Sequence, residues 1–149
     1  MKQFFAFFLL MMFCNSCFLF SDLKKTNFSF SENGTILSIK AVVPKKYSKT
    51  ETRIDSTGNQ VQYFLYPGGA QLYFAFLNDT NTQLQTINYE ENIPKELYNT
   101  IYFKGIDSSN LYWRETKFAN YKAGYRNVES DDEGTFDSAI NYFSLHLMR

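Results

Sequence analysis

The sequence predicts an α+β domain, in which one strongly bent, mainly antiparallel sheet of six or seven strands carries a single C-terminal helix packed across it. Short segments of alternating apolar and polar residues dominate residues 35–128, and this alternation is typical of strands. Two tight reversals, at residues 67–69 and 119–120, indicate antiparallel hairpins. Only residues 136–147 carry apolar side chains at the 3.6-residue period of a helix. Hairpins followed by one helix are typical of the α+β class.

The strands are expected in this order: residues 35–43, 49–55, 60–66, 71–77, 100–104, 111–118 and 121–128. The polar alternation of residues 49–55 indicates an edge strand, and residues 49–77 together predict a three-stranded meander. Residues 78–92 lack periodicity, which predicts a long loop with a short strand near residues 86–89. Proline is favoured at the first position of a helix, so residues 94–97 predict one helical turn.

An acidic loop is expected at residues 129–134, immediately before the helix, which Thr135 would cap. Four acidic residues in this loop raise the alternative of a calcium site, but they lack the ligand spacing of an EF-hand. The favoured interpretation is therefore a solvated loop, and no metal site is predicted.

Aromatic residues occupy both faces of the two central strands, residues 60–66 and 71–77. An antiparallel sheet with one face in water would alternate more sharply. A single helix covers only one face. The other face must be covered by a curl of the sheet, by the long loop after residue 77, or by a ligand or partner.

The N-terminus has the organisation of a secretory signal. Lys2 provides a positive start, and the apolar run at residues 4–13 fits a signal core but is short for a membrane span. Ser16 is a small residue before a cleavage point, and Cys17 follows as a residue that can be acylated. These residues resemble a bacterial lipobox. An ordinary cleaved signal peptide and an uncleaved anchor over residues 4–20 stay open as alternatives.

The chain is therefore expected to have three parts: a signal peptide at residues 1–16, a lipidated polar tether at 17–33 and a single α+β domain at 34–149. Lipidation of Cys17 would hold the protein on a membrane of the cell envelope. If the lipid is absent, a secreted or periplasmic protein is expected instead.

Composition excludes several kinds of chemistry. The 15 basic and 15 acidic residues balance, so no charge excess points to nucleic acid as a partner. Both cysteines, Cys14 and Cys17, lie in the N-terminal segment, which leaves the domain without a thiol nucleophile. The one histidine, His146, is expected on the last turn of the helix, where cations are favoured. The sequence contains no nucleotide-binding loop, zinc-protease helix or nucleophile elbow, so no catalytic residue and no cofactor is predicted.

The candidate ligand site lies on the hairpin that turns at residues 119–120. A two-residue turn there places Arg114 opposite Tyr125 on one face, with a cation–π contact between them and Tyr112 as a neighbour. Trp113 points to the opposite face and is expected in the core under the helix. An anionic or sugar-like ligand is therefore expected on the face that the helix leaves free. The alternative is that Arg114 only covers Tyr125 with its aliphatic stem.

Four stretches resemble a family of small envelope lipoproteins from Bacteroidota-type bacteria, to which no activity is assigned. The stretches are Val43–Tyr47, Tyr66–Tyr73, Gly124–Val128 and Phe136–Ile140. The resemblance covers most of residues 35–145. A weaker similarity to PsbP-like envelope domains rests on Phe136, Ile140 and Phe143, whose spacing departs from the pattern of those domains.

A non-catalytic envelope module that binds a protein or a glycan is the function that these observations favour. The alternative is a secreted hydrolase or another enzyme that uses carboxylates. Asp131 and Asp132 are paired carboxylates, but the sequence contains nothing that would orient them.

Overall fold

The computed structural model describes residues 22–32, 34–78, 95–97 and 100–147. The predicted signal peptide, the lipidation site Cys17 and the predicted strand near residues 86–89 lie outside these ranges. Among the described residues, no helix combines the length and the apolar character needed to cross a membrane.

The described strands form two antiparallel sheets. The elements follow one another as β1 (Leu23–Glu32), β2 (Thr35–Pro44), β3 (Lys49–Ile54), β4 (Gln60–Leu65), β5 (Gln71–Phe76), β6 (Lys95–Leu97), β7 (Thr100–Ile106), β8 (Tyr112–Phe118), β9 (Tyr121–Val128) and α2 (Ser130–Leu147). A seven-stranded sheet has the order β3-β4-β5-β9-β8-β7-β6, and β1 pairs only with β2. The predicted α+β class is confirmed, with one C-terminal helix packed against the sheet.

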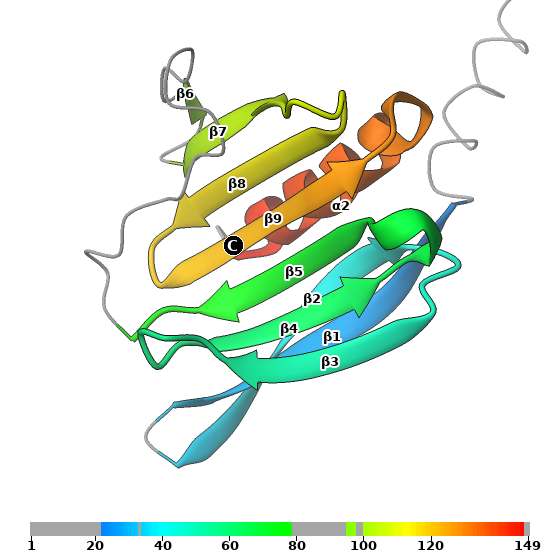
Figure 1. Cartoon of the computed structure of the whole chain (residues 1–149). Coiled ribbons are helices and arrows are strands. Elements are labelled where there is room, and N and C mark those ends of the chain that lie inside the picture. The colour runs from blue at the N-terminus through cyan, green and yellow to red at the C-terminus, as the bar shows by residue number, and fades with distance from the viewer. Residues whose placement is uncertain (1–21, 33, 79–94, 98–99, 148–149) are drawn as a thin grey trace, which may run out of the picture.

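Helix α2 and the β1–β2 hairpin lie beside each other on one face of the seven-stranded sheet (Figure 1). We call this the inner face and the opposite one the outer face. Phe143 of α2 is central to the core: its ring centre lies 4.5 Å from that of Phe74 on β5 and 6.1 Å from that of Phe28 on β1. The β1–β2 hairpin and the helix therefore cover the inner face together. This position of the hairpin was not predicted from the sequence.

Strand β1 corrects the prediction of a polar tether over residues 17–33. Phe28 and Phe30 alternate with Ser29 and Ser31, so the strand buries both aromatic side chains and exposes both serines. The ring of Phe30 stacks on Phe76 at 4.3 Å. The folded domain therefore begins at β1 rather than at residue 34. The alternation of apolar and polar residues extends over only four residues, 28–31, and the polar residues around them did not indicate a strand.

Two backbone groups on the free edge of β1 are bonded by the side chain of Gln60 on β4. The backbone N–H of Ser31 donates to Gln60 Oε1 at 3.1 Å, and Gln60 Nε2 donates to the carbonyl oxygen of Ser29 at 3.3 Å. This amide joins the hairpin to the seven-stranded sheet and satisfies edge groups that otherwise invite pairing with another chain.

The meander predicted at residues 49–77 is confirmed as β3, β4 and β5, with β3 at an edge of the sheet. Gly68 and Gly69 adopt φ angles of 78° and 90° in the reversal between β4 and β5, a conformation that favours glycine. The helical turn predicted at residues 94–97 is wrong. Residues 95–97 form the short strand β6, because their backbone finds hydrogen-bond partners on β7.

Helix α2 begins at Ser130, so the prediction of an acidic loop before a helix capped by Thr135 is wrong. Asp131, Asp132 and Glu133 lie in the first turn, where carboxylates are stabilised by the positive end of the helix dipole. Gly134, the last residue of the expected loop, also lies within the helix. The predicted position of His146 in the last turn is confirmed.

The register of the hairpin β8–β9 agrees with the prediction from its two-residue turn. Arg114 pairs with Tyr125, and Phe118 pairs with Tyr121. A bulge between Tyr112 and Arg114 then shifts the register, so that Tyr112 pairs with Val128. The turn thus fixes the half of the hairpin nearest to it.

The outer face also carries buried apolar side chains. Val61, Tyr73, Ala75 and Leu77 form a cluster there, separate from the main core on the inner face. The sequence indicated that both faces of the central strands are covered, and the burial of β4 and β5 on both sides agrees with this.

Candidate functional site

Arg114 and Tyr125 are brought together as predicted, but on the inner face, beneath α2. Arg114 Nη1 lies 2.9 Å and Tyr125 Oη 3.0 Å from Oδ1 of Asp137 on the helix. The prediction that they lie on the face free of the helix is wrong, because each face of this hairpin carries both aromatic and charged residues and alternation alone does not select one. The guanidinium group lies 4.8 Å from the ring centre of Tyr102, and this is the cation–π contact that the structure contains in place of the one predicted with Tyr125.

Asp137 is the centre of an ionic network between helix and sheet. Besides Arg114 and Tyr125, it binds Lys104 Nζ at 2.5 Å through Oδ2, and Lys104 also reaches Glu133 at 2.6 Å. Burial raises the pKa of Asp137, but hydrogen bonds from Lys104 and Arg114 outweigh it and hold that pKa below its usual value of 3.8. The pKa of the Tyr125 hydroxyl is raised, first by burial and then by the charge of Asp137. The charge states of both groups are thus fixed near neutral pH, which suits anchoring of the helix better than proton transfer.

Tyr112 and Trp113 lie on opposite faces of β8. Tyr112 is half-buried and packs on the main core, farther along the strand from the Asp137 network. Trp113 is only 2% exposed on the outer face, where its ring lies against Gly105. The prediction that Trp113 lies under the helix is therefore wrong, for the same reason as for Arg114. The polar groups of Arg114 and Tyr125 are used within the protein, so they leave little for a ligand.

A second buried carboxylate lies on the outer face. Glu115 is 1% exposed, with Lys122 Nζ 2.8 Å from Oε1 and Arg126 Nη2 3.6 Å from Oε2. Beside it, the phenol of Tyr73 crosses Gly124, where no side chain would fit. A buried charge needs such partners because its desolvation is costly. This cluster is therefore explained as compensated charge within the sheet.

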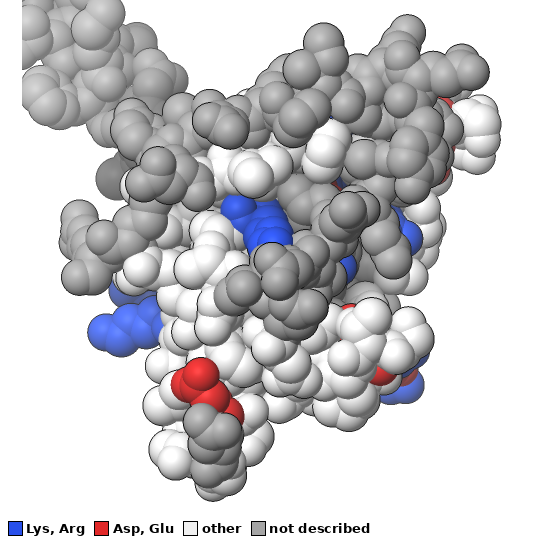
Figure 2. Space-filling view, turned by 90° about the vertical axis from the view of Figure 1, so that its left-hand side faces the viewer, with Lys and Arg blue, Asp and Glu red and all other residues white. Residues whose placement is uncertain are grey.

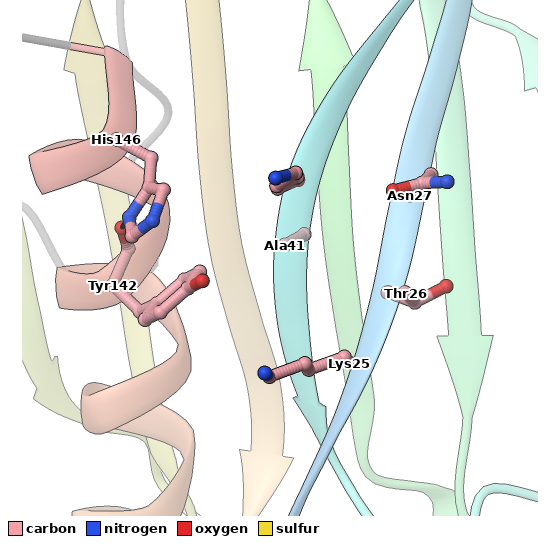
Figure 3. A pocket seen from close by; sticks show the side chains of 7 residues that line it. Lys25, Thr26, Asn27, Ala41, Tyr142 and His146 are labelled. Carbon is pink, nitrogen blue, oxygen red and sulfur yellow. Dashed lines mark hydrogen bonds between the residues drawn. The ribbon is translucent and has the colours of Figure 1, made fainter. Parts of the chain in front are cut away.

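An open pocket of about 380 Å³ lies between the C-terminal half of α2 and the β1–β2 hairpin. Its walls are formed by Lys25, Thr26, Asn27, Lys40, Ala41, Tyr142 and His146. Figure 3 shows the side chain of Lys25 reaching from β1 toward the helix, while Tyr142 and His146 face the strands. The volume falls within the range of about 300–1,000 Å³ that is usual for small-molecule sites.

The charge of this pocket is one-sided. Two lysines line it and no carboxylate does, and neither Lys25 nor Lys40 forms an ion pair with any residue that the structure describes. Other cations of the chain do have carboxylate partners, as Lys104 has in Asp137 and Glu133. The pocket therefore presents positive charge that the described protein leaves uncompensated.

The helix contributes an ordered aromatic pair to the pocket. The rings of Tyr142 and His146 are stacked at 3.9 Å, one helical turn apart. His146 Nδ1 lies 3.1 Å from the carbonyl oxygen of Tyr142, which fixes the orientation of the imidazole. This arrangement leaves Nε2 of His146 and the hydroxyl of Tyr142 for contacts outside the helix.

The described charges elsewhere are scattered or paired. Among the described residues visible in Figure 2, basic and acidic side chains form small separate patches, and no continuous basic stripe of the kind typical of nucleic-acid binding joins them. Within the described ranges, no group of three or more His, Cys, Asp or Glu residues could hold a metal ion.

In comparisons with known proteins, no protein-family model, no curated protein and no solved structure matches this chain. Function is therefore inferred from the geometry of its own sites.

Sequence reasoning missed the pocket because it assigned Lys25, Thr26 and Asn27 to a tether. The only available signal was the alternation of Phe28 and Phe30, which would have made the segment a strand and paired it with residues 35–44. Lys25 and Lys40 would then have appeared on the same side of one hairpin.

Proposed function

We propose that this chain is an exported lipoprotein of a bacterial envelope, and that its domain is a non-catalytic binding module. The observation that carries the proposal is the pocket between α2 and the β1–β2 hairpin, with its uncompensated lysines and its stacked Tyr142 and His146. It combines a suitable volume with hydrogen-bonding side chains from three elements, which is how a binding site fixes a small molecule.

Export and anchoring are supported by the N-terminal sequence, with Lys2, the apolar run at residues 4–13 and Cys17 after Ser16. Only residues 18–22 separate Cys17 from the start of β1. A fully extended chain of that length spans at most about 20 Å. Lipidation of Cys17 would therefore hold the domain close to the membrane surface rather than on a long tether.

The alternative of a carboxylate enzyme has less support. A general acid that works near neutral pH needs a raised pKa, whereas hydrogen bonds from Lys104 and Arg114 lower that of Asp137 in spite of its burial. Glu115 is likewise occupied by Lys122 and Arg126. These carboxylates hold elements of the fold together.

Anchoring is tested by expressing the full chain in a bacterial host with a fatty-acid analogue. Wild type and Cys14→Ala, the matched control, should incorporate the label and fractionate with membranes. Cys17→Ala should lose the label and leave the membrane fraction. If Cys17→Ala stays in the membrane without label, the uncleaved anchor is the better account.

The binding module is tested by screening the full-length protein, purified in detergent, against envelope glycans and peptides. At least one compound should bind without being converted to a product, and Tyr142→Ala should weaken its binding. Turnover of any compound would instead favour the enzyme, if it is lost in a carboxylate-to-amide variant whose melting curve matches that of wild type.

A further inference from the structure

We propose that the ligand of the pocket is an acidic sugar, a pyranose ring that carries a carboxylate; this rests on the proposed function of the domain as a binding module. Two features of the pocket identify the class. Lys25 and Lys40 provide the charge that a carboxylate needs, and the ring pair of Tyr142 and His146 provides a flat wall for a sugar ring.

The two lysines are neighbours on one face of the hairpin. In the β1–β2 register, Lys25 pairs with Val42 and Asn27 pairs with Lys40, so Lys25 and Lys40 are diagonal neighbours about 7–8 Å apart at the backbone. Like charges on neighbouring strands repel each other. Because no described carboxylate pairs with either lysine, a bound carboxylate would remove the repulsion and form charge-assisted hydrogen bonds with both ammonium groups.

The acidic residues of α2 are kept away from this site. Asp131, Asp132 and Glu133 lie in its first turn, and Asp137 is held by Lys104 and Arg114, whereas the pocket contacts the last turns of the helix. The helix therefore offers no carboxylate that would compete with an anionic ligand.

The remaining walls fit the neutral part of a sugar. The C–H face of a pyranose can pack against the stacked rings of Tyr142 and His146 by dispersion contacts. Asn27, opposite Lys40 on the hairpin, has an amide that can both donate to and accept from sugar hydroxyls. A free inorganic anion would leave these groups unused, which is why the geometry points to a sugar acid rather than to an anion alone.

The test compares glucuronate with glucose, which lacks the carboxylate but shares the ring, on the full-length protein in detergent. Calorimetric titration should give glucuronate a Kd at least tenfold lower than that of glucose. Lys25→Gln and Lys40→Gln should each weaken glucuronate binding about tenfold, the usual worth of a hydrogen bond to a charged group, and leave glucose binding unchanged. Lys46→Gln, an exposed lysine outside the pocket, is the matched control and should change neither.

Melting curves without ligand check the fold of each variant. Lys25→Gln and Lys40→Gln should keep or slightly raise the wild-type Tm, because each removes one of two repelling charges. Acetate and inorganic phosphate serve as sugar-free anions and should bind much more weakly than glucuronate.

Three results would overturn the proposal. Equal affinity for glucose and glucuronate would show that the lysines do not recognise the carboxylate. Acetate or phosphate binding as tightly as glucuronate would show that the sugar ring is not recognised. No glucuronate binding, while another compound of the envelope panel binds, would show the wrong ligand class but leave the binding module intact. If no compound of the panel binds, the proposed function fails as well.

Discussion

Arg114 on β8 and Tyr125 on β9 lie directly opposite each other and bond the same atom, Oδ1 of Asp137, at distances of 2.9 and 3.0 Å. The shared carboxylate belongs to α2, so this cross-strand pair also holds the helix on the sheet. Arg114 is further positioned by Thr116, whose hydroxyl oxygen accepts from Arg114 Nε at 3.1 Å. The pair that the sequence suggested as a ligand site is thus explained as the attachment point of the helix.

Replacing Asp137 by asparagine should destabilise the fold strongly. Arg114 is 6% exposed, and a buried cation without its partner costs about 3 kcal/mol or more. Tyr125→Phe removes one hydrogen bond to the charged carboxylate and leaves the ion pairs in place, so about 1.5–3 kcal/mol is expected. Asp131→Asn, in the exposed first turn, should cost less than about 1 kcal/mol. Urea unfolding of the three variants measures their order of stability. An Asp137→Asn variant as stable as Asp131→Asn would contradict the role of Asp137 in holding the helix on the sheet.

The same carboxylate should make stability depend on acid pH. Hydrogen bonds from Lys104 and Arg114 outweigh burial and hold the pKa of folded Asp137 below 3.8, its value in an unfolded chain. A group with a lowered folded pKa stabilises the fold fully above the unfolded value and loses that contribution as pH falls through the folded one. The free energy of unfolding of wild type should therefore fall more steeply below about pH 4 than that of Asp137→Asn. Parallel slopes would mean that other carboxylates dominate.

Gly124 and Gly134 should respond in opposite directions to alanine. A Cβ on Gly124 would lie 2.5 Å from the backbone oxygen of Arg114 and still closer to the Tyr73 hydroxyl, so Gly124→Ala should cost about 3 kcal/mol or more. A Cβ on Gly134 meets nothing within 4 Å. Gly134→Ala should therefore stabilise α2 by about 0.5–1 kcal/mol. Thermal melting of both variants checks this, and a destabilised Gly134→Ala would place residue 134 outside the helix.

Strand β1 should be indispensable to the domain. Phe28 is fully buried against Phe74 and Phe143, so Phe28→Ala should cost about 3–5 kcal/mol. Its neighbour Ser29 is exposed, and Ser29→Ala should have almost no effect. If chemical denaturation shows both variants to be as stable as wild type, residues 23–32 behave as a tether after all.

The sequence was informative where local chemistry decides the structure. The two-residue turn at Ala119 and Asn120 fixed the register that brings Arg114 opposite Tyr125, and the glycines after Pro67 fixed the meander. It was misleading where tertiary contacts decide. Both faces of the central strands carry aromatic residues, so alternation could not say which face α2 covers, and the expected positions of Arg114, Tyr125 and Trp113 relative to the helix were wrong for this reason.

Two other errors had local causes. Four acidic residues suggested a loop at residues 129–134, although three of them lie in the first turn of the helix, where its dipole stabilises carboxylates. Phe28 and Phe30 form too short an alternation to stand out in a polar segment, and the pocket depends on that strand. The candidate site was therefore not predicted, because strand β1, which forms one of its walls, was not recognised.

The most direct test of the account is a titration of the isotope-labelled full-length protein with glucuronate, followed by NMR. Chemical-shift changes should be confined to the residues around the pocket, Lys25 to Asn27, Lys40, Ala41, Tyr142 and His146, and the glucuronate should not be consumed over many hours. Shifts centred on Arg114 and Tyr125 instead, or consumption of the ligand, would contradict it.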